Sequence, residues 1–249
     1  MGRVDAVARE YAPTPIRRWC GEAALTLQRQ LEARGALPHA SIAVPAAEAL
    51  GLNRPLAEGV GLVFDLLQTA IDVADNIADV EEDASAGRPP VYLGIPKAAL
   101  ICLPSLLTGM ALSHLTSTFE EGQFGTSYSC RRILQILGAM TLGQSVPKPD
   151  VRHDQLVSGR QGVLLCLPFW LVAKRSPAWR RRLPRVERWS YRFGLTWEAR
   201  ERRLDMPTGA AVAAHQRSLV AAQRAWPDFA PFRPGDALSA QALIAGGLS

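Results

Sequence analysis

The sequence predicts an all-α protein, a single helical bundle over residues 1–249. Apolar residues recur at helical spacing along most of the chain. No segment shows the alternation of apolar and polar residues, flanked by hairpin turns, that indicates strands. The apolar content of 48% is enough for a large core, and no linker is long enough to divide the chain. One all-α domain is the fold class that these observations favour.

The first expected helices are set by their start and stop signals. Thr14 is an N-cap residue followed by proline at the first helical position, and Gly35 is the matching stop. A second helix is expected over residues 39–50, with a kink at Pro45 because proline cannot complete the helical hydrogen bonds.

The rest of the chain follows the same helical pattern. A long helix is expected over residues 56–83, followed by a loop over 84–90 that contains glycine and two prolines. Further helices are expected near residues 95–117, 127–145, 154–174, 177–183 and 185–205, then up to about residue 224, and finally from residue 237.

The chain is basic, with a formal net charge of +5. Most of the excess lies between Lys174 and Arg203. Such a stretch forms a solvated helix surface, attracts an anionic diphosphate, or binds nucleic acid. No nucleic-acid recognition motif accompanies it, so no nucleic-acid partner is expected.

Three features of the sequence bear on location. The cysteines are scattered and form no Cys-x-x-Cys pair, which indicates buried free thiols in a reducing compartment: Cys20, Cys102, Cys130 and Cys166. The N-terminus lacks the apolar region of a secretory signal. The longest apolar run, residues 98–112, is interrupted by Pro104 and Gly109 and is short for a membrane span. We therefore expect a cytoplasmic protein without an integral membrane span.

The most informative feature is a stripe of aspartates in the helix expected over 56–83. Asp72, Asp75, Asp79 and Asp83 lie within about 80° of one line on that helix. Like charges on one stripe repel, so the pattern gives a bare helix no stability. Carboxylate oxygens suit Mg²⁺, which binds through one or two carboxylates together with a phosphate substrate. The stripe therefore predicts a magnesium site.

A second acidic stripe repeats this spacing. Glu198, Glu201 and Asp205 stand at the same offsets as the first three aspartates. If the two stripes packed face to face in a bundle, they would enclose a site for metal and phosphate. The alternative is an ordinary exposed helix in which Glu198 and Arg202 form an i,i+4 ion pair.

With both stripes in place, the chain resembles the trans-isoprenyl diphosphate synthase family, the polyprenyl synthetases, and its class I terpene synthase relatives. The resemblance covers about residues 30 to 225 and places four segments in the order of that family. They are Leu66-Leu-Gln-Thr…Asp75-Asn-Ile-Ala-Asp79, Gly138-Ala-Met-Thr-Leu-Gly143-Gln144, Ser158-Gly-Arg160-Gln-Gly162 and Phe193-Gly-Leu-Thr-Trp-Glu-Ala-Arg-Glu201-Arg-Arg-Leu-Asp205.

The resemblance implies the isoprenoid synthase fold and a Mg²⁺-dependent activity. In that family, metal ions bound by two aspartate-rich helices draw pyrophosphate from an allylic prenyl diphosphate and leave a carbocation. It implies catalytic roles for Asp75, Asp79 and Glu201. The implied metal-binding residues are Asp72, Asp75, Asn76, Asp79, Asp83, Glu201 and Asp205, and the implied diphosphate contacts are Arg160, Arg202 and Gln144. Alternatively, Arg160 is a surface residue at a helix start, and Gln144 satisfies a buried backbone group.

The departures from the family pattern guide the choice of activity. The basic residues that bind isopentenyl diphosphate are missing around Gly35 and His39, Asn76 replaces an aspartate, and Glu201-Arg202 replaces an Asp-Asp pair. His39 and His153 are expected at the surface or in loops.

The first expected function is that of a class I terpene synthase-like enzyme, in which the carbocation cyclises or loses a proton. One alternative is a prenyltransferase that joins the allylic group to an isoprenoid or another acceptor. A second is a non-catalytic subunit or regulator of an active prenyl diphosphate synthase, which Arg202 in the second stripe favours. A homodimer, or a heterodimer with a related synthase, is expected in each case.

Overall fold

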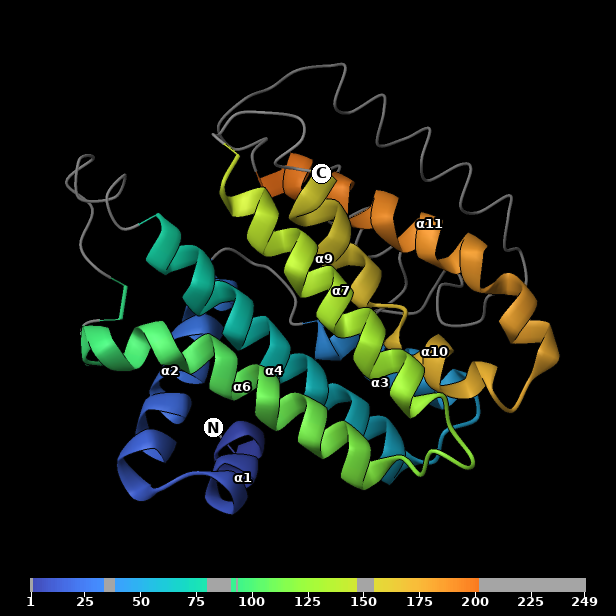
Figure 1. Cartoon of the computed structure of the whole chain (residues 1–249), viewed down its shortest axis with the longest axis horizontal. Helices are drawn as coiled ribbons and strands as arrows, with labels where there is room; N and C mark the ends of the chain where they lie inside the picture. The colour runs from blue at the N-terminus through green and yellow to red at the C-terminus, as the bar shows by residue number, and fades with distance from the viewer. Residues whose placement is uncertain (1, 34–38, 80–90, 93, 147–154, 202–249) are drawn as a thin grey trace. The chain divides into compact units, whose positions relative to one another are not determined.

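The computed structural model describes residues 2–33, 39–79, 91–92, 94–146 and 155–201. Helices make up 82% of the described residues, and these residues contain no strand. Figure 1 shows the helices along the chain. The prediction of an all-α protein is therefore confirmed.

The chain forms two compact units, and each is described by itself. The first consists of Met1–Val44 and Leu52–Glu120, and the second of Pro45–Gly51 and Glu121–Ser249. Helix α3, Ala40–Ala49, runs from the first unit into the second and contains Pro45. The expectation of a single domain over residues 1–249 stays a prediction.

Among the described residues, four helices lie wholly within the first unit. They are α1 (Gly2–Tyr11), α2 (Thr14–Ala33), α4 (Arg54–Ala78) and α6 (Lys97–Thr118). Helices α4 and α6 lie side by side along most of their length, and α1 and α2 pack against both (Figure 1). Helix α2 begins at the residue that its cap signal predicts, whereas α1 was not expected from the sequence.

Helix α4 is the central element of this unit. Its N-terminus is capped by Asn53, whose side-chain oxygen accepts a hydrogen bond from the Leu56 amide at 3.1 Å, and proline occupies the first turn. Its buried residues extend as far as Val73 and include Phe64, which is 1% exposed. Burial of each such large side chain contributes about 1.5–3 kcal/mol. The helix ends at Asp79 as C-cap.

His39 lies in the turn before α3, which fits the expected loop position, but its side chain is buried, so a surface position is excluded. The residue is 7% exposed, and its backbone N–H donates to the side-chain oxygen of Gln68 at 3.0 Å. Its ring meets that of Phe64 edge-on at 6.3 Å. Burial lowers the pKa of the imidazole to about 4, so His39 is neutral at pH 7. His153 lies outside the described residues.

In the described part of the second unit, four further helices are present. They are α7 (Thr126–Gln144), α9 (Ser158–Leu164), α10 (Leu167–Ala173) and α11 (Pro177–Glu201). Helix α11 packs against α9 and α10, and α7 packs against the same two helices. The core is aliphatic and aromatic, with Trp170 as one of its largest fully buried side chains.

Two helix boundaries in the second unit differ from those expected. The helix predicted over 154–174 is divided into α9 and α10 at residues 165–166, because Pro168 fits the first turn of a new helix but not the interior of a long one. The two helices predicted over 177–183 and 185–205 are joined in α11, which runs through Pro184.

All four cysteines are free thiols, but they differ in burial. Cys20 and Cys166 are buried as expected, Cys130 is half-buried and Cys102 is exposed on α6. The expectation of burial was therefore wrong for Cys102.

Helix α6 is long and apolar enough to cross a membrane, and it is the one helix of the described residues for which this holds. Core helices of water-soluble proteins meet the same criterion, and α6 packs against α4 within the first unit. This helix is therefore weak support for a membrane span.

Candidate functional site

The first acidic stripe lies at the C-terminal end of α4. Asp72, Asp75 and Asp79 are half-buried and flank or follow Val73, the last buried residue of the helix. Asp79 is the C-cap, and its amide donates to the backbone oxygen of Asp75 at 2.9 Å. The acids thus begin where the apolar face of α4 ends. Asp83 lies outside the described residues.

Asp72 is engaged by two neighbouring side chains. The Tyr92 hydroxyl donates a hydrogen bond to Oδ2 of Asp72. Asn76 donates from Nδ2 to the same carboxylate oxygen at 3.3 Å and to the Asp72 backbone oxygen at 2.8 Å. Burial, together with the charge of Asp72, raises the pKa of Tyr92, so the phenol remains a hydrogen-bond donor.

These contacts limit which atoms of α4 fit a magnesium ion. Asp75 and Asp79 are carboxylates one helical turn apart, and the amide oxygen of Asn76 is a further oxygen donor. Asp72 already accepts from Tyr92 and Asn76. Nowhere in the described part of the chain do three or more His, Cys, Asp or Glu side chains form a group that could hold a metal ion. Within the described residues, α4 therefore offers a partial ligand set that suits a hard cation.

The glycines of the segment 158–162 allow α9 to approach α11 closely. A Cβ added to Gly159 would lie 2.6 Å from the Tyr191 ring, and one added to Gly162 would lie 2.6 Å from the Gly194 amide nitrogen. A side chain at position 159 would displace the Tyr191 ring, and one at position 162 would require the backbone of α11 to move. The segment is therefore built for direct helix contact.

Arg160 lies between these glycines and stacks on α11. Its guanidinium carbon is 5.7 Å from the centre of the Tyr191 ring, a cation–π distance. Its Nε atom is buried and has no hydrogen-bond partner. A buried donor without an acceptor is unfavourable, so an oxyanion that reached this atom would gain an interaction. Arg160 thus fits the expected contact with a diphosphate.

The other predicted site residues of the second unit are less fully described. Gln144 is half-buried at the last position of α7. Glu198 and Glu201 lie on α11, but their side chains are outside the description, as are residues Arg202 and Asp205 altogether. The two acidic stripes belong to different units, so the expectation that they face each other stays a prediction.

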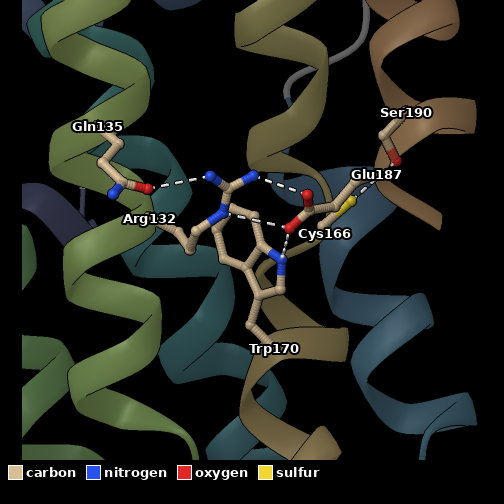
Figure 2. A network of polar contacts seen from close by, with 6 residues as sticks. All are labelled: Arg132, Gln135, Cys166, Trp170, Glu187 and Ser190. Atoms are coloured by element: carbon tan, nitrogen blue, oxygen red, sulfur yellow. Dashed lines mark hydrogen bonds and ion pairs between the residues drawn. The ribbon is translucent and has the colours of Figure 1, made fainter. Parts of the chain in front are cut away.

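The structure adds a polar cluster that the sequence did not reveal. Glu187 accepts hydrogen bonds from Arg132 and from the indole of Trp170, which come from α7 and α10 (Figure 2). Glu187 lies among arginines in the sequence and therefore reads as one member of a solvated charge run. Its true partner, Arg132, is 55 residues away and no sequence pattern joins them.

Comparison with known proteins does not extend the resemblance. No protein-family model matches this chain, and no curated protein sequence matches it.

Proposed function

We propose that this protein is a Mg²⁺-dependent, class I terpene synthase-like enzyme that acts on an allylic prenyl diphosphate. We further propose that its helices adopt the isoprenoid synthase fold. The observation that carries the proposal is the end of α4, where Asp75 and Asp79 stand one turn apart beyond the apolar face of a buried helix. Arg160, with its buried unpaired Nε, supports a binding site for an oxyanion.

Each group has a part in the proposed chemistry. Asp75, Asp79 and Asn76 would hold Mg²⁺ from α4, with Glu201 and Asp205 as ligands from the second stripe. The bound metal would neutralise the charge that develops on the leaving pyrophosphate. Arg160 would bind and orient the diphosphate, and aliphatic side chains would keep water from the reacting carbon.

The proposal includes a dimer in the cytoplasm. Exposed apolar side chains on α7, namely Leu134 at 53% and Leu142 at 61% exposure, support association with a second copy or with a related synthase. Light scattering coupled to size-exclusion chromatography would give the oligomeric state directly.

The experiment that tests this function is a diphosphate-release assay on the full chain. Geranyl, farnesyl and geranylgeranyl diphosphate are incubated with Mg²⁺, with and without isopentenyl diphosphate, and pyrophosphate and hydrocarbon products are measured. Release without isopentenyl diphosphate, abolished by a chelator, is the expected result. Release only with an added acceptor would replace the proposal with prenyl transfer.

A second candidate is a non-catalytic subunit of an active synthase. The engagement of Asp72 by Tyr92 and Asn76 favours it, because one carboxylate of the stripe already has partners within the protein. No release with any substrate, combined with stable association with an active synthase, would select this candidate.

A further inference from the structure

Three side chains hold α11 at one point of the second unit, and we call them the Glu187 clamp: Arg132, Trp170 and Glu187. Arg132 donates from Nε and Nη2 to the two carboxylate oxygens of Glu187, at 3.2 and 2.7 Å. Trp170 donates from Nε1 to the first of these oxygens at 2.9 Å. Figure 2 shows these side chains converging from α7, α10 and α11. A bidentate pair with a third donor fixes the carboxylate in direction as well as position.

The clamp is partly shielded from water. The side chains of Arg132 and Glu187 are 21% and 22% exposed, whereas those of the surface pair Lys174 and Glu121 are 39% and 53% exposed. Arg132 also lies over the Trp170 ring, with its guanidinium carbon 5.8 Å from the ring centre. Solvent screening weakens this pair less than an exposed one.

The same face of α11 is held at the next two turns. Cys166 donates from its thiol to the Ser190 hydroxyl at 3.2 Å, and both residues are buried. Gly194 then lies against Gly162 of α9, in the close approach described above. Glu187, Ser190 and Gly194 therefore mark one continuous face that is turned toward α9 and α10.

Pro184 explains why the rotation of α11 needs to be restrained by contacts with other helices. Proline has no N–H, so the helical hydrogen bond that residue 184 would donate is absent. At the proline, the two halves of α11 are therefore joined less rigidly than in an unbroken helix. The C-terminal half can rotate more easily relative to the N-terminal half. The clamp begins only three residues later, where it supplies the missing constraint.

Helical register extends this face to the second acidic stripe. Position 198 follows Glu187 by eleven residues and position 201 by fourteen, which places them about 20° and 40° from Glu187 around the helix axis. Position 198 is also one turn beyond Gly194. Any rotation of α11 about its axis that moves Glu187 therefore moves positions 198 and 201 with it.

We propose that Glu187 is a positioning residue: held by Arg132 and Trp170, it fixes the rotation of α11 so that the face with positions 198 and 201 is turned toward α9. The consequence for ligand binding rests on the proposed function. Loss of the clamp leaves α11 helical but lets its C-terminal half rotate.

The first arm of the test measures the rotation itself. Unnatural amino acids that carry spin labels replace Leu134 on α7, which is exposed, and the residue at position 199 on α11. Pulsed EPR gives the distance distribution between the two labels. Glu187→Gln is expected to shift or broaden the distribution, while the matched surface variant Glu121→Gln leaves it unchanged. An unchanged distribution in Glu187→Gln would overturn the proposal, whatever the protein binds.

The second arm measures pyrophosphate affinity by calorimetry in the presence of Mg²⁺. Glu187→Gln and Arg132→Met are each expected to weaken pyrophosphate binding by about tenfold, a loss typical of removing a residue that orients a metal ligand. The double variant is expected to bind no more weakly than either single variant. Ile133→Val, a buried change next to Arg132, serves as the control for lost stability. If Glu187→Gln binds within twofold of that control, its positioning role is overturned. If the wild-type protein binds no pyrophosphate, the proposed function fails, and the EPR distances alone decide on the clamp.

Discussion

The hydroxyl of Tyr92 donates a hydrogen bond to the carboxylate of Asp72. This contact joins the residues that follow segment 80–90 to the end of α4, one turn before Asp75. It gives Asp72 a role in the fold in addition to the metal-binding role that the sequence pattern predicts.

Tyr92→Phe is expected to lower the free energy of unfolding by about 2 kcal/mol, because a hydrogen bond to a charged group contributes roughly 1.5–3 kcal/mol. Urea unfolding at pH 7 measures this loss. Tyr11→Phe is the control, on a half-buried tyrosine at the end of α1. An equal loss in both variants would contradict a special role for the Asp72 contact.

The same contact gives the wild-type protein a dependence on alkaline pH. The pKa of Tyr92 is raised in the fold by burial and by Asp72, relative to about 10 in the unfolded chain. The unfolded state therefore loses this proton first, and stability falls as pH rises above about 10. Unfolding curves between pH 8 and 11 should show a smaller decline in Tyr92→Phe than in the wild type.

Asp75 and Asp72 are expected to differ in their effect on turnover. Asp75→Asn should reduce pyrophosphate release by more than about 100-fold, because it removes a metal ligand. Losing only a residue that orients a metal ligand reduces activity by about 10- to 100-fold. For Asp72→Asn, the loss of pyrophosphate release should lie within this range of about 10- to 100-fold. Glu58→Gln, elsewhere on α4, is the control. Equal activity of Asp75→Asn and wild type would remove the stripe from the mechanism.

Buried His39 predicts a loss of stability in weak acid. Its pKa is about 4 in the fold against 6.5 for the ordinary imidazole, so the unfolded state binds a proton first as pH falls. The contribution is present above pH 6.5 and is lost progressively toward pH 4, by up to about 3 kcal/mol. His39→Gln should remove this component from urea unfolding measured between pH 7 and 4.5. The same decline in both proteins would assign the acid sensitivity to carboxyl groups instead.

The contact between α9 and α11 predicts opposite outcomes for two glycine substitutions. Gly162→Ala should destabilise the second unit by at least about 1–3 kcal/mol, the range for overpacking, because the new methyl group meets the backbone of α11. Gly138→Ala on α7 is the matched control, since its Cβ meets nothing within 4 Å. It should be neutral or stabilise by about 0.4–1 kcal/mol. Thermal unfolding of both variants measures the contrast.

Local signals predicted most of the helices, while tertiary packing decided the rest. The N-cap at Thr14 and the proline after it predict the start of α2 correctly, because capping depends on adjacent residues. Pro184 predicts a helix boundary, yet α11 continues through it and packs against α9 and α10. Such contacts outweigh the local preference of proline, and no local pattern reveals them.

In the candidate site, too, local pattern predicts some features and tertiary contacts determine the others. Helical periodicity places Asp72, Asp75 and Asp79 together at the end of α4. It does not reveal that Tyr92 binds Asp72, nor that Glu187 pairs with Arg132, because both contacts depend on how distant segments meet. The burial of His39 was missed for the same reason.

The uneven burial of the thiols has a practical use. Cys102 is exposed on α6, whereas burial raises the pKa of Cys20 to about 11 and also raises that of Cys166. A maleimide at neutral pH should therefore attach to Cys102 first, since the nucleophile is the thiolate. The native chain thus carries its own handle for a fluorophore or for immobilisation on a sensor chip.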